Sequence, residues 1–382
     1  MQTKSIILIA GIATICFAAM SSQNIKDTPA YESGEFSKTK TIQASATAST
    51  SAERIYTDSI SDFCRKLQPL GRILETKDYY VWCVAPIYDK KGKVHVFYSR
   101  WLSSKGMGGW LNGSEIAHAV ADKPEGPYTY LETVLAPRPG FWDATTCHNP
   151  HIQYLDGTYY LFYMGNCNGN TNTKRIGLAT SRSLYGPWKR SDKPLLDVGK
   201  KGGWEDHCTT NPAFVRTPDG ECRLYYKSWN DSAYQTEKGS IRGNRKYGLA
   251  IAEKPEGPYT KFYGNPVIDL SVYGGNKQVE DAYVWYEDGV YKMLMRDMGF
   301  YNHTVGLYFQ SKDGLSWGQP QIGWFGLDHY VQETPAPSYL KRYGRLERPQ
   351  LLMRKGKPAY LFNAAQGGAF GTASGFVFKI TQ

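Results

Sequence analysis

Cysteine is scarce in this sequence and never occurs in the spacing that zinc sites use. Seven cysteines occur among 382 residues, and no two of them form a C-x-x-C pair, so a zinc ribbon or finger is not expected. Long apolar runs are also lacking. The one substantial run, residues 6–19, is shorter than a comfortable membrane span, and no other segment is long enough. The sequence thus predicts neither a zinc-stabilised module nor a membrane-spanning protein.

Acidic side chains are outnumbered by basic ones. The 35 Asp and Glu residues face 45 Lys and Arg, which gives a formal net charge of +10. No basic cluster or helical DNA-binding motif accompanies this excess, so a nucleic-acid partner is not expected. The charge indicates a surface suited to acidic glycans, sulfated or uronic. A generally soluble basic surface explains it equally well.

The first 51 residues have the composition of an export signal followed by a linker. Lys4 precedes the apolar run and two serines follow it, which is typical of a signal peptide over residues 1–22. A lipid anchor at Cys16 is less favoured, because bulky Ile15 stands where a lipobox has a small residue. Residues 23–51 are rich in Ser, Thr, Ala and Lys and predict a disordered tether. The protein is therefore expected to be secreted or periplasmic.

Export would place the six remaining cysteines in an oxidising compartment, where disulfides form. Some pairing is therefore expected, although six cysteines allow 15 connectivities. Cys208 and Cys222 flank one predicted inner strand and are the pair considered first.

Residues 52–78 are expected to form a helix and a ring-closing segment. Tyr56, Ile60, Phe63 and Leu67 are spaced four, three and four residues apart, which is the spacing of one face of a single helix packed on the outside of the domain. Residues 71–80 would then donate an outer strand that the last repeat lacks.

Aromatic residues are plentiful, at 14% of the chain with 29 Tyr, and they recur in a repeat. In residues 140–166 a Trp-acid pair precedes Asn149-Pro150, and Asp156-Gly157 separates two apolar runs, which is a strong hairpin signal. Related units follow one another at steps of 64, 62, 70 and 67 residues. Their equivalent positions are Pro86, Pro150, Pro212, Ala282 and Pro349.

The end of each unit repeats even more clearly. The heptapeptide KPEGPYT occurs at residues 123–129 and again at 254–260, two steps apart. Five units of four strands predict an all-β five-bladed β-propeller over residues 79–382, with a short N-terminal helical extension. A pair of β-sandwiches would explain neither the five steps nor the duplicated heptapeptide.

Inner strands of a propeller begin at one rim of a central channel, so polar residues just before the repeat positions are expected to converge there. Glu280 and Asp281 have the strongest case for a catalytic role, because adjacent carboxylates at a strand mouth should raise the pKa of one of them. Asp143 and Glu205 could instead order their loops. The other residues expected near the channel mouth are His148, Asn149, His151, Asp206, His207, Asn211, His303, His329, Glu333, Glu347 and Arg348.

The blade pattern x-P-x-I…DG-x-YYLFY…IGLATS…GPW resembles the five-bladed propeller glycosidases, in particular glycoside hydrolase family 43 and the related anhydrogalactosidase family 117. Family 43 implies a general base in the first blade, a pKa-tuning acid in the third and a general acid in the fourth. These positions are Ala85, Asn211 and Glu280 here, so only the last matches. The loop GFWDATTCHNP resembles the acid-bearing loop of family 117 and points to Asp143. The use of a His as acid in that family points to His303.

The sequence therefore predicts an exported glycoside hydrolase, exo-acting on plant or algal oligosaccharides that are acidic or sulfated. Hydrolysis needs an acid and a base or nucleophile: Glu280 with its neighbour Asp281 is assigned the acid role, and Asp143 or Asp206 the base. No cofactor is expected to be required. The residues expected to bind substrate through hydroxyl, anionic or ring contacts are His148, His151, His207, Arg296, Arg348, Trp82, Trp101, Trp142 and Trp204.

Three of these expectations have alternatives. The histidines, His303 included, could donate protons or hold a central cation such as Ca²⁺. A carbohydrate-binding propeller without catalysis would explain the missing first-blade acid. A polysaccharide lyase, with a His or Tyr base beside an Arg or metal that neutralises a uronate, would explain the basic charge.

Overall fold

A computed structural model describes residues 59–236, 242–333, 340 and 342–382 of the chain. The predicted signal peptide and tether, and Cys16, lie outside the described residues. Within the described ranges no helix is both long and apolar enough to cross a membrane. The prediction of an all-β protein is confirmed, because strands dominate and the α-helices are single short turns: α2 (Asp62–Arg65), α3 (Asp231–Thr236) and α4 (Leu327–Tyr330).

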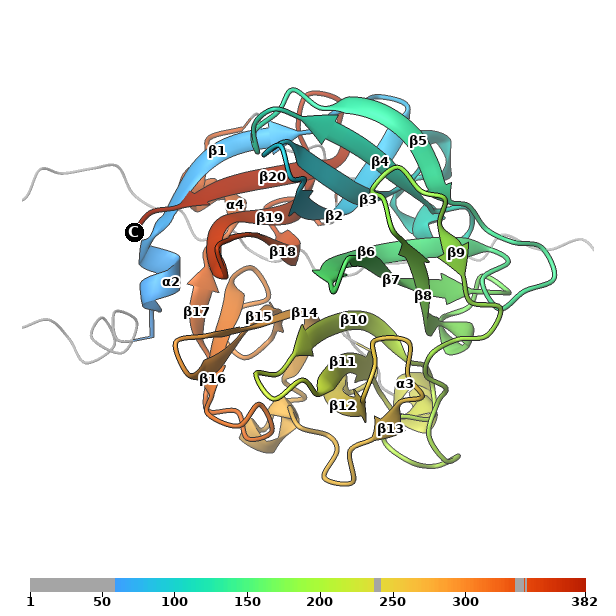
Figure 1. Cartoon of the computed structure of the whole chain (residues 1–382). Helices are drawn as coiled ribbons and strands as arrows, with labels where there is room; N and C mark the ends of the chain where they lie inside the picture. The colour runs from blue at the N-terminus through green and yellow to red at the C-terminus, as the bar shows by residue number, and fades with distance from the viewer. Residues whose placement is uncertain (1–58, 237–241, 334–339, 341) are drawn as a thin grey trace, which may run out of the picture. The chain divides into compact units, whose positions relative to one another are not determined.

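Each sequence repeat forms an up-and-down antiparallel group of strands (Figure 1). Three groups are separate four-stranded sheets. They comprise β6 (Thr146–Leu155), β7 (Thr158–Asn166), β8 (Arg175–Ser181) and β9 (Lys189–Arg190); β10 (Thr210–Arg216), β11 (Cys222–Ser228), β12 (Lys246–Ala252) and β13 (Thr260–Lys261); and β14 (Gln278–Glu287), β15 (Val290–Met298), β16 (Gly306–Ser311) and β17 (Gln321–Trp324).

The first and last repeats share one eight-stranded sheet, so hydrogen bonding defines four sheets among the described residues. A single parallel bridge, Tyr80 to Ala373, joins the two halves. The strands of this sheet are β2 (Tyr79–Tyr88), β3 (Val94–Leu102), β4 (Glu115–Ala121) and β5 (Thr129–Leu135), with β18 (Leu346–Arg354), β19 (Lys357–Gly367), β20 (Thr372–Ile380) and β1 (Leu67–Ile73).

The first strands of the repeats lie side by side around a common centre (Figure 1). β2 contacts β6, β6 contacts β10, β10 contacts β14, β14 contacts β18, and β18 contacts β2. Residues near the start of these strands therefore meet at the centre, which is the convergence that the repeat predicts.

The N-terminal part of the described chain adds a strand where the last repeat needs one. β1 pairs antiparallel with β20 from Leu67 to Ile73, whereas the sequence places this strand at residues 71–80. The predicted helix is wrong at its C-terminal end, because helical structure stops at Arg65 and Leu67 already begins β1. Pairing with β20 satisfies a sheet edge that would otherwise be open, and this outweighs the helical spacing of the apolar residues.

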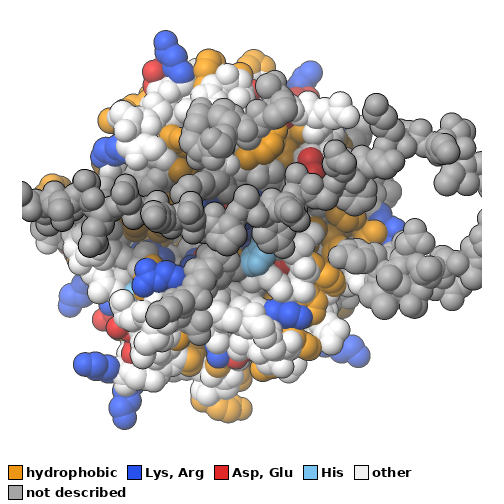
Figure 2. All heavy atoms as spheres, turned by 180° about the vertical axis from the view of Figure 1, so that it is seen from behind, with side chains coloured by type: hydrophobic (Ala, Val, Ile, Leu, Met, Phe, Trp, Pro, Cys, Tyr) orange, Lys and Arg blue, Asp and Glu red, His pale blue; other side chains and the backbone are white. Residues whose placement is uncertain are grey.

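Positive charge is dispersed over the surface. Figure 2 shows the face opposite to that of Figure 1, where the uncovered Lys and Arg side chains stand apart from one another, some at its edge and some nearer its middle. No single basic patch is visible on that face.

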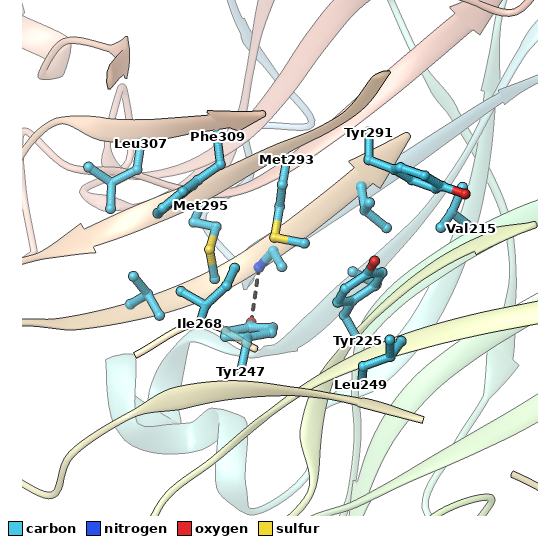
Figure 3. Close-up of a cluster of buried hydrophobic side chains, with 14 of the residues drawn as sticks. Val215, Tyr225, Tyr247, Leu249, Ile268, Tyr291, Met293, Met295, Leu307 and Phe309 are labelled. Atoms are coloured by element: carbon cyan, nitrogen blue, oxygen red, sulfur yellow. Dashed lines mark hydrogen bonds between the residues drawn. The ribbon is translucent and has the colours of Figure 1, made fainter. Parts of the chain in front are cut away.

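Apolar faces of neighbouring sheets pack together between the repeats. Figure 3 shows one such cluster, in which Tyr225 and Tyr247 of the third repeat face Met293 and Met295 of the fourth. The Tyr247 hydroxyl accepts a hydrogen bond from the Ala282 backbone N–H at 3.0 Å. This hydrogen bond joins the apolar core to β14 and so helps to fix the position of that strand.

The predicted disulfides are wrong. All six cysteines in the described residues are free thiols: Cys64, Cys83, Cys147, Cys167, Cys208 and Cys222. The pair considered first fails for a geometric reason. Arg216 pairs with Cys222 at the turn end of the β10–β11 hairpin, and Thr210 pairs with Lys227 near the other end. At about 3.3 Å per residue, Cys208 is too far from Cys222 for a disulfide, which needs Cα atoms within about 7 Å.

Candidate active site

Five equivalent residues, one from each repeat, meet at the centre of the first strands. Each lies at a shift in the register between the first two strands of its repeat. Each has a left-handed backbone, with φ between 47° and 63°, a conformation that is costly for residues other than Gly, Asn and Asp. The five, here called the central ring, are Cys83, Asn149, Asn211, Asp281 and Arg348.

The central ring corrects the alignment of the first repeat. The structure places Cys83-Val84, and not Ala85-Pro86, opposite Asn149-Pro150 of the next repeat, because Cys83 holds the register shift. The first-repeat position that family 43 reserves for its base is therefore Cys83. Burial raises the pKa of the Cys83 thiol, so this residue is not a base either.

Hydrogen bonds link the members of the central ring. Asn149 Nδ2 donates to Asn211 Oδ1 at 3.0 Å, and Asn211 Nδ2 donates to Asp281 Oδ1 at 2.6 Å. Arg348 Nη1 donates to the same Asp281 oxygen at 3.1 Å, and its Nη2 approaches Cys83 Sγ at 3.4 Å. A guanidinium thus occupies the centre beside a buried carboxylate. Ca²⁺ needs six to eight oxygen ligands, so these residues do not fit a central Ca²⁺, and no cluster of metal-ligating side chains occurs elsewhere in the described part of the chain.

A cavity of about 510 Å³ opens above the central ring. Its aromatic lining consists of Trp82, Trp101, Trp110, Trp229 and Tyr234. Its acidic side chains are Glu280, Asp281 and Glu347, beside the imidazoles of His148 and His303. Its basic side chains are Lys174, Lys227, Arg245, Arg296, Arg342, Arg345 and Arg348. Seven cations against three carboxylates make this cavity strongly electropositive.

The floor of the cavity is built by repetition. The residue before each central-ring residue faces the same space in four of the five repeats: Trp82, His148, Glu280 and Glu347. The cross-strand partner of Glu280 is Arg296. The register of the first hairpin thus sets which side chains can take part in chemistry.

Three cations surround the Glu280 carboxylate. Lys227 Nζ lies 2.6 Å from Oε1, Arg245 Nε lies 2.8 Å from Oε1, and Arg296 Nη1 lies 2.8 Å from Oε2. Burial opposes ionisation, but these cations outweigh it and hold the pKa of Glu280 well below its usual value. The expected raised pKa is therefore not found at Glu280, and a lowered pKa does not suit the predicted role of general acid. The group remains a carboxylate.

Glu347 shares a partner with Glu280. Arg296 Nη1 lies 3.3 Å from Glu347 Oε2 and 2.8 Å from Glu280 Oε2. Glu347 is 2% exposed, and its Oε1 has no hydrogen-bond partner among the described residues. One guanidinium thus holds two carboxylates of neighbouring repeats in the same cavity.

Two of the predicted histidines reach the cavity. His148 packs between Trp101 and Trp110 with its Nδ1 2.8 Å from Ser114 Oγ. Burial, reinforced by nearby cations, holds its pKa well below the usual value, so the ring is neutral. His303 lies after β15 in a left-handed conformation, and burial lowers its pKa as well.

The other two histidines that were predicted to bind substrate do not line the cavity. Both ring nitrogens of His151 are engaged, Nδ1 with Gln350 Oε1 at 3.1 Å and Nε2 with the Phe214 backbone N–H at 3.3 Å. His207 Nδ1 lies 2.6 Å from Asp231 Oδ1, and its Nε2 lies 2.9 Å from Thr171 Oγ1. The predictions that His151 and His207 contact substrate are wrong, because their polar atoms hold the surrounding loops.

The two carboxylates that were predicted to act as the base hold the fold together instead. Asp143 is fully buried outside the cavity, where it accepts bonds from Arg138 Nε at 3.1 Å, from Tyr163 Oη at 2.8 Å and from Arg190. Asp206 accepts backbone N–H groups of Gly202 and Asp231, each at 2.7 Å. Neither carboxylate can act on a ligand in the cavity.

The Trp-acid pairs repeat for a structural reason. Trp142 lies against Gly165 and Gly177, where a Cβ would come within 2.4 and 2.3 Å of its ring. In the next repeat Trp204 packs on Tyr226, whose hydroxyl donates to Glu205 at 2.6 Å. Trp142 and Trp204 therefore face neighbouring strands, and their predicted contact with sugar is wrong. The predicted Trp82 and Trp101 do line the cavity.

Asp143→Asn is expected to lower stability without changing chemistry. Removing the charge leaves Arg138 and Arg190 without their buried partner, which costs about 3–5 kcal/mol of unfolding free energy. Urea unfolding of the variant measures this loss. Turnover of the fraction that remains folded should equal that of the unchanged protein, and a large fall in that turnover would return Asp143 to the catalytic machinery.

Of the two predicted arginines, one is committed to the fold. Both terminal nitrogens of Arg348 bind within the central ring, and its Nε is buried without a partner in the described residues. A forked grip of Arg348 on substrate is therefore ruled out. Arg296 uses Nη1 for the two glutamates and remains beside the cavity.

Sequence reasoning missed several cavity residues. Lys227 occupies the position in β11 that Arg296 occupies in β15, since each pairs with the residue before a central-ring residue. The repeat could therefore have revealed Lys227. Lys174, Arg245, Trp110 and Trp229 come from connections whose lengths differ between repeats, and no sequence pattern marks them.

Comparison with known proteins supports the resemblance to the glycosidases. No protein-family model matches the chain. A protein of Neosartorya fischeri named as a probable arabinan endo-1,5-α-L-arabinosidase C is 36% identical over 104 residues, which cover 26% of this chain and 27% of that protein. The arabinan endo-1,5-α-L-arabinosidase A of Aspergillus niger is 27% identical over 164 residues, which cover 40% and 49%. The chain thus spans half or less of the length of these curated relatives.

Solved structures match over most of the described chain. A family 117 glycoside hydrolase of the marine bacterium Zobellia galactanivorans superposes with a TM-score of 0.60 and 17% identity, covering 82% of this chain and 90% of that one. A family 43 β-xylosidase/α-arabinofuranosidase from a compost metagenome, in complex with xylotriose, gives a TM-score of 0.52 and 16% identity, covering 82% and 93%. The predicted resemblance to families 43 and 117 is confirmed at the level of fold.

Proposed function

We propose that this chain is an exported, five-bladed propeller glycoside hydrolase that acts on plant or algal oligosaccharides, acidic or sulfated ones included. The observation that carries the proposal is the pair Glu280 and Glu347, held by Arg296 on the floor of a cavity with indole walls. Carboxylates at the scissile bond and aromatic faces for sugar rings are what glycoside hydrolysis requires. The likeness in fold to families 43 and 117 supports the same chemistry.

The chemistry assigns different roles from those in the sequence prediction. Breaking a glycosidic C–O bond requires a proton for the leaving oxygen and a carboxylate that deprotonates water or attacks carbon. Glu280 stays ionised and serves as the carboxylate. His303 lines the same cavity without a hydrogen-bond partner among the described residues, and it supplies the proton.

The size of the cavity supports exo-action. A cavity of about 510 Å³ lies within the range of small-molecule pockets. Such a cavity accommodates one end of an oligosaccharide and not a long internal segment. The products are then short sugars released from a chain end.

Product analysis on a panel of plant and marine oligosaccharides tests the proposal. The expected result is new reducing sugar of one or two units, formed without early shortening of the whole chain. Binding without any release would favour a carbohydrate-binding protein. Random shortening would contradict exo-action.

A lyase remains the second candidate because two neutral histidines stand beside arginines in the cavity. Burial lowers the pKa values of His148 and His303, which favours the neutral imidazole that a base for proton abstraction needs, and Arg345 could neutralise a uronate. Lyase products carry unsaturated ends that absorb ultraviolet light. Their appearance in the same panel would replace the hydrolase proposal.

The pH dependence should report His303. As the acid, His303 must be protonated, and its pKa lies below the usual 6.5. Activity is therefore expected at acidic pH and should fall as pH rises through that lowered pKa. Glu280 titrates far below its usual value, so little activity should be lost down to about pH 4 on its account. Measuring kcat/KM against pH tests this. His303→Ala should remove the decline at higher pH, and an unchanged profile in that variant would exclude His303.

A further inference from the structure

Two cations of the cavity have no carboxylate partner. Lys227 and Arg245 pair with Glu280, Arg296 pairs with both glutamates, Arg342 lies 3.5 Å from Glu347, and Arg348 pairs with Asp281. Within the described ranges this leaves Lys174 and Arg345. Each is held in a separate corner of the cavity.

The Lys174 corner consists of Lys174, Trp110 and Trp229. The Lys174 side chain is 4% exposed, and its Nζ lies 4.6 Å from the centre of the Trp229 ring and 5.7 Å from that of Trp110. No hydrogen bond or ion pair involves this Nζ in the described part of the chain. Burial lowers the pKa of the ammonium to about 8. The two indole rings stabilise this cation, but burying it without a carboxylate partner is still costly.

The main chain fixes where this cation points. The Lys174 N–H donates to Thr171 O at 3.3 Å, and its carbonyl accepts from the Thr209 N–H at 3.1 Å. These bonds tie the second repeat to the third. The backbone of Lys174 is therefore anchored in the cavity wall, where its side chain is buried.

The Arg345 corner consists of Arg296, Arg342 and Arg345. Burial lowers the pKa of Arg345, and the charges of Arg296 and Arg342 lower it further. Residues 334–339 and 341, which precede Arg345 in the chain and lie outside the described part, contain no Asp or Glu. Three guanidinium groups with one nearby pair of glutamates leave a local deficit of negative charge.

Glu280 interacts with both corners. Lys227 and Arg245, which also lower the pKa of Lys174, bind Glu280 Oε1, whereas Arg296 of the Arg345 corner binds Oε2. Both unpaired cations are also close enough to Glu280 to interact with its charge, so a ligand over this carboxylate lies in the field of both. An anionic group at each corner would be desolvated and charge-assisted, which makes such contacts strong.

We infer that the cavity binds an oligosaccharide with two anionic groups, one on each side of the bond above Glu280, and that Lys174 and Arg345 are the residues that select them. This inference rests on the proposed function for the identity of that bond. The shared chemistry is a carboxylate or a sulfate ester on adjacent sugars. A neutral arabinan or xylan fragment would leave both cations buried and unpaired, so the cavity discriminates against it.

Calorimetric binding with matched ligands tests the inference on the full chain. The probes are a trigalacturonate and the same trisaccharide after reduction of its carboxyl groups, with a sulfated galactose trisaccharide and its desulfated form as the second arm. The acidic member of a pair should bind at least about tenfold more tightly than its neutral counterpart. Whichever arm shows the difference identifies the anionic group, and no difference in either arm overturns the inference.

Substitutions of Lys174 and Arg345 test whether each corner binds an anionic group. Lys174→Met and Arg345→Met should each weaken binding of the acidic trisaccharide by about tenfold or more, and neither should change binding of the neutral one. The matched controls are Lys254→Met and Arg182→Met, which remove exposed charges outside the cavity and should change nothing. Equal losses for acidic and neutral ligands would show a merely structural role and overturn the assignment.

Two further readouts separate selection from folding. Removing an unpaired buried cation should leave the thermal midpoint unchanged or raised, and a marked fall in both variants would contradict a ligand-binding role. Binding of the acidic ligand should also weaken as pH rises through about 8, and Lys174→Arg should abolish that step. The other charged or titratable groups facing Lys174 are Lys227, Arg245, Glu280, Cys208, His148 and His207.

Failure of this inference and failure of the proposed function look different. Charge-dependent binding without release of sugar would refute the hydrolase and leave the two corners standing. Hydrolysis of neutral fragments that neither variant affects would refute the role of the two corners and leave the hydrolase proposal standing.

Discussion

Glu280→Gln is expected to lower turnover by about 10²–10⁴-fold, the range that a catalytic acid or base contributes. Glutamine keeps the size and one hydrogen-bond acceptor of glutamate but cannot take a proton or attack carbon. The change should appear in kcat more than in KM, because the lost interaction belongs to the transition state. Circular dichroism of the same preparation checks that the strands remain intact.

Rescue by a small anion sharpens this experiment. Glu280→Ala leaves Lys227, Arg245 and Arg296 around an empty position, and these cations should hold azide or formate where the carboxylate was. Partial recovery of turnover with azide is then expected. Asp206→Asn is the control, because that carboxylate caps backbone N–H groups outside the cavity and its loss should leave turnover near normal. Normal turnover in Glu280→Gln on a confirmed substrate would place the reacting carboxylate elsewhere.

Arg348→Met is expected to destabilise the protein by about 3–5 kcal/mol, the usual cost of leaving a buried charge without its partner. Asp281 is 4% exposed and accepts hydrogen bonds from Arg348 Nη1, from Asn211 Nδ2 and from the Arg348 backbone N–H. Without the guanidinium, its buried carboxylate keeps only two neutral donors and no compensating charge. The midpoint of urea unfolding measures the loss.

A double variant separates charge from shape. Asp281→Asn combined with Arg348→Met removes both charges, so it should unfold at a higher urea concentration than Arg348→Met alone. The prediction is falsified if the single variant is as stable as the unchanged protein, because the central ring would then contribute nothing to the fold.

Repetition made part of the site predictable. The steps of the Asn-Pro position and the duplicated KPEGPYT segment required equivalent strands to meet, and residues just before those positions line the cavity, Glu280, Glu347 and His148 among them. For Asp143 the resemblance of its loop to family 117 pointed to a catalytic base. Its partners, Arg138, Tyr163 and Arg190, show that this carboxylate orders its own repeat instead.

The cysteines show a similar limit to what the sequence can predict. Their even number and the export-like N-terminus predict disulfides, whereas the strand register keeps Cys208 and Cys222 at opposite ends of one hairpin. Register is set by how two strands pair with each other. It cannot be read from the composition or the residue spacing of a single strand.

The sequence by itself determined the strand-rich repeat, the positions that face the centre and the likeness to families 43 and 117, because periodic apolar runs and turn residues act locally and recur. Only the tertiary structure decided what those positions can do. Glu280 was predicted to be an acid from its neighbour Asp281, yet its protonation state depends on Lys227, Arg245 and Arg296, two of which come from a different repeat. Electrostatic interactions depend on distance in space, and residues 16 to 53 positions away in the chain supply the nearest charges.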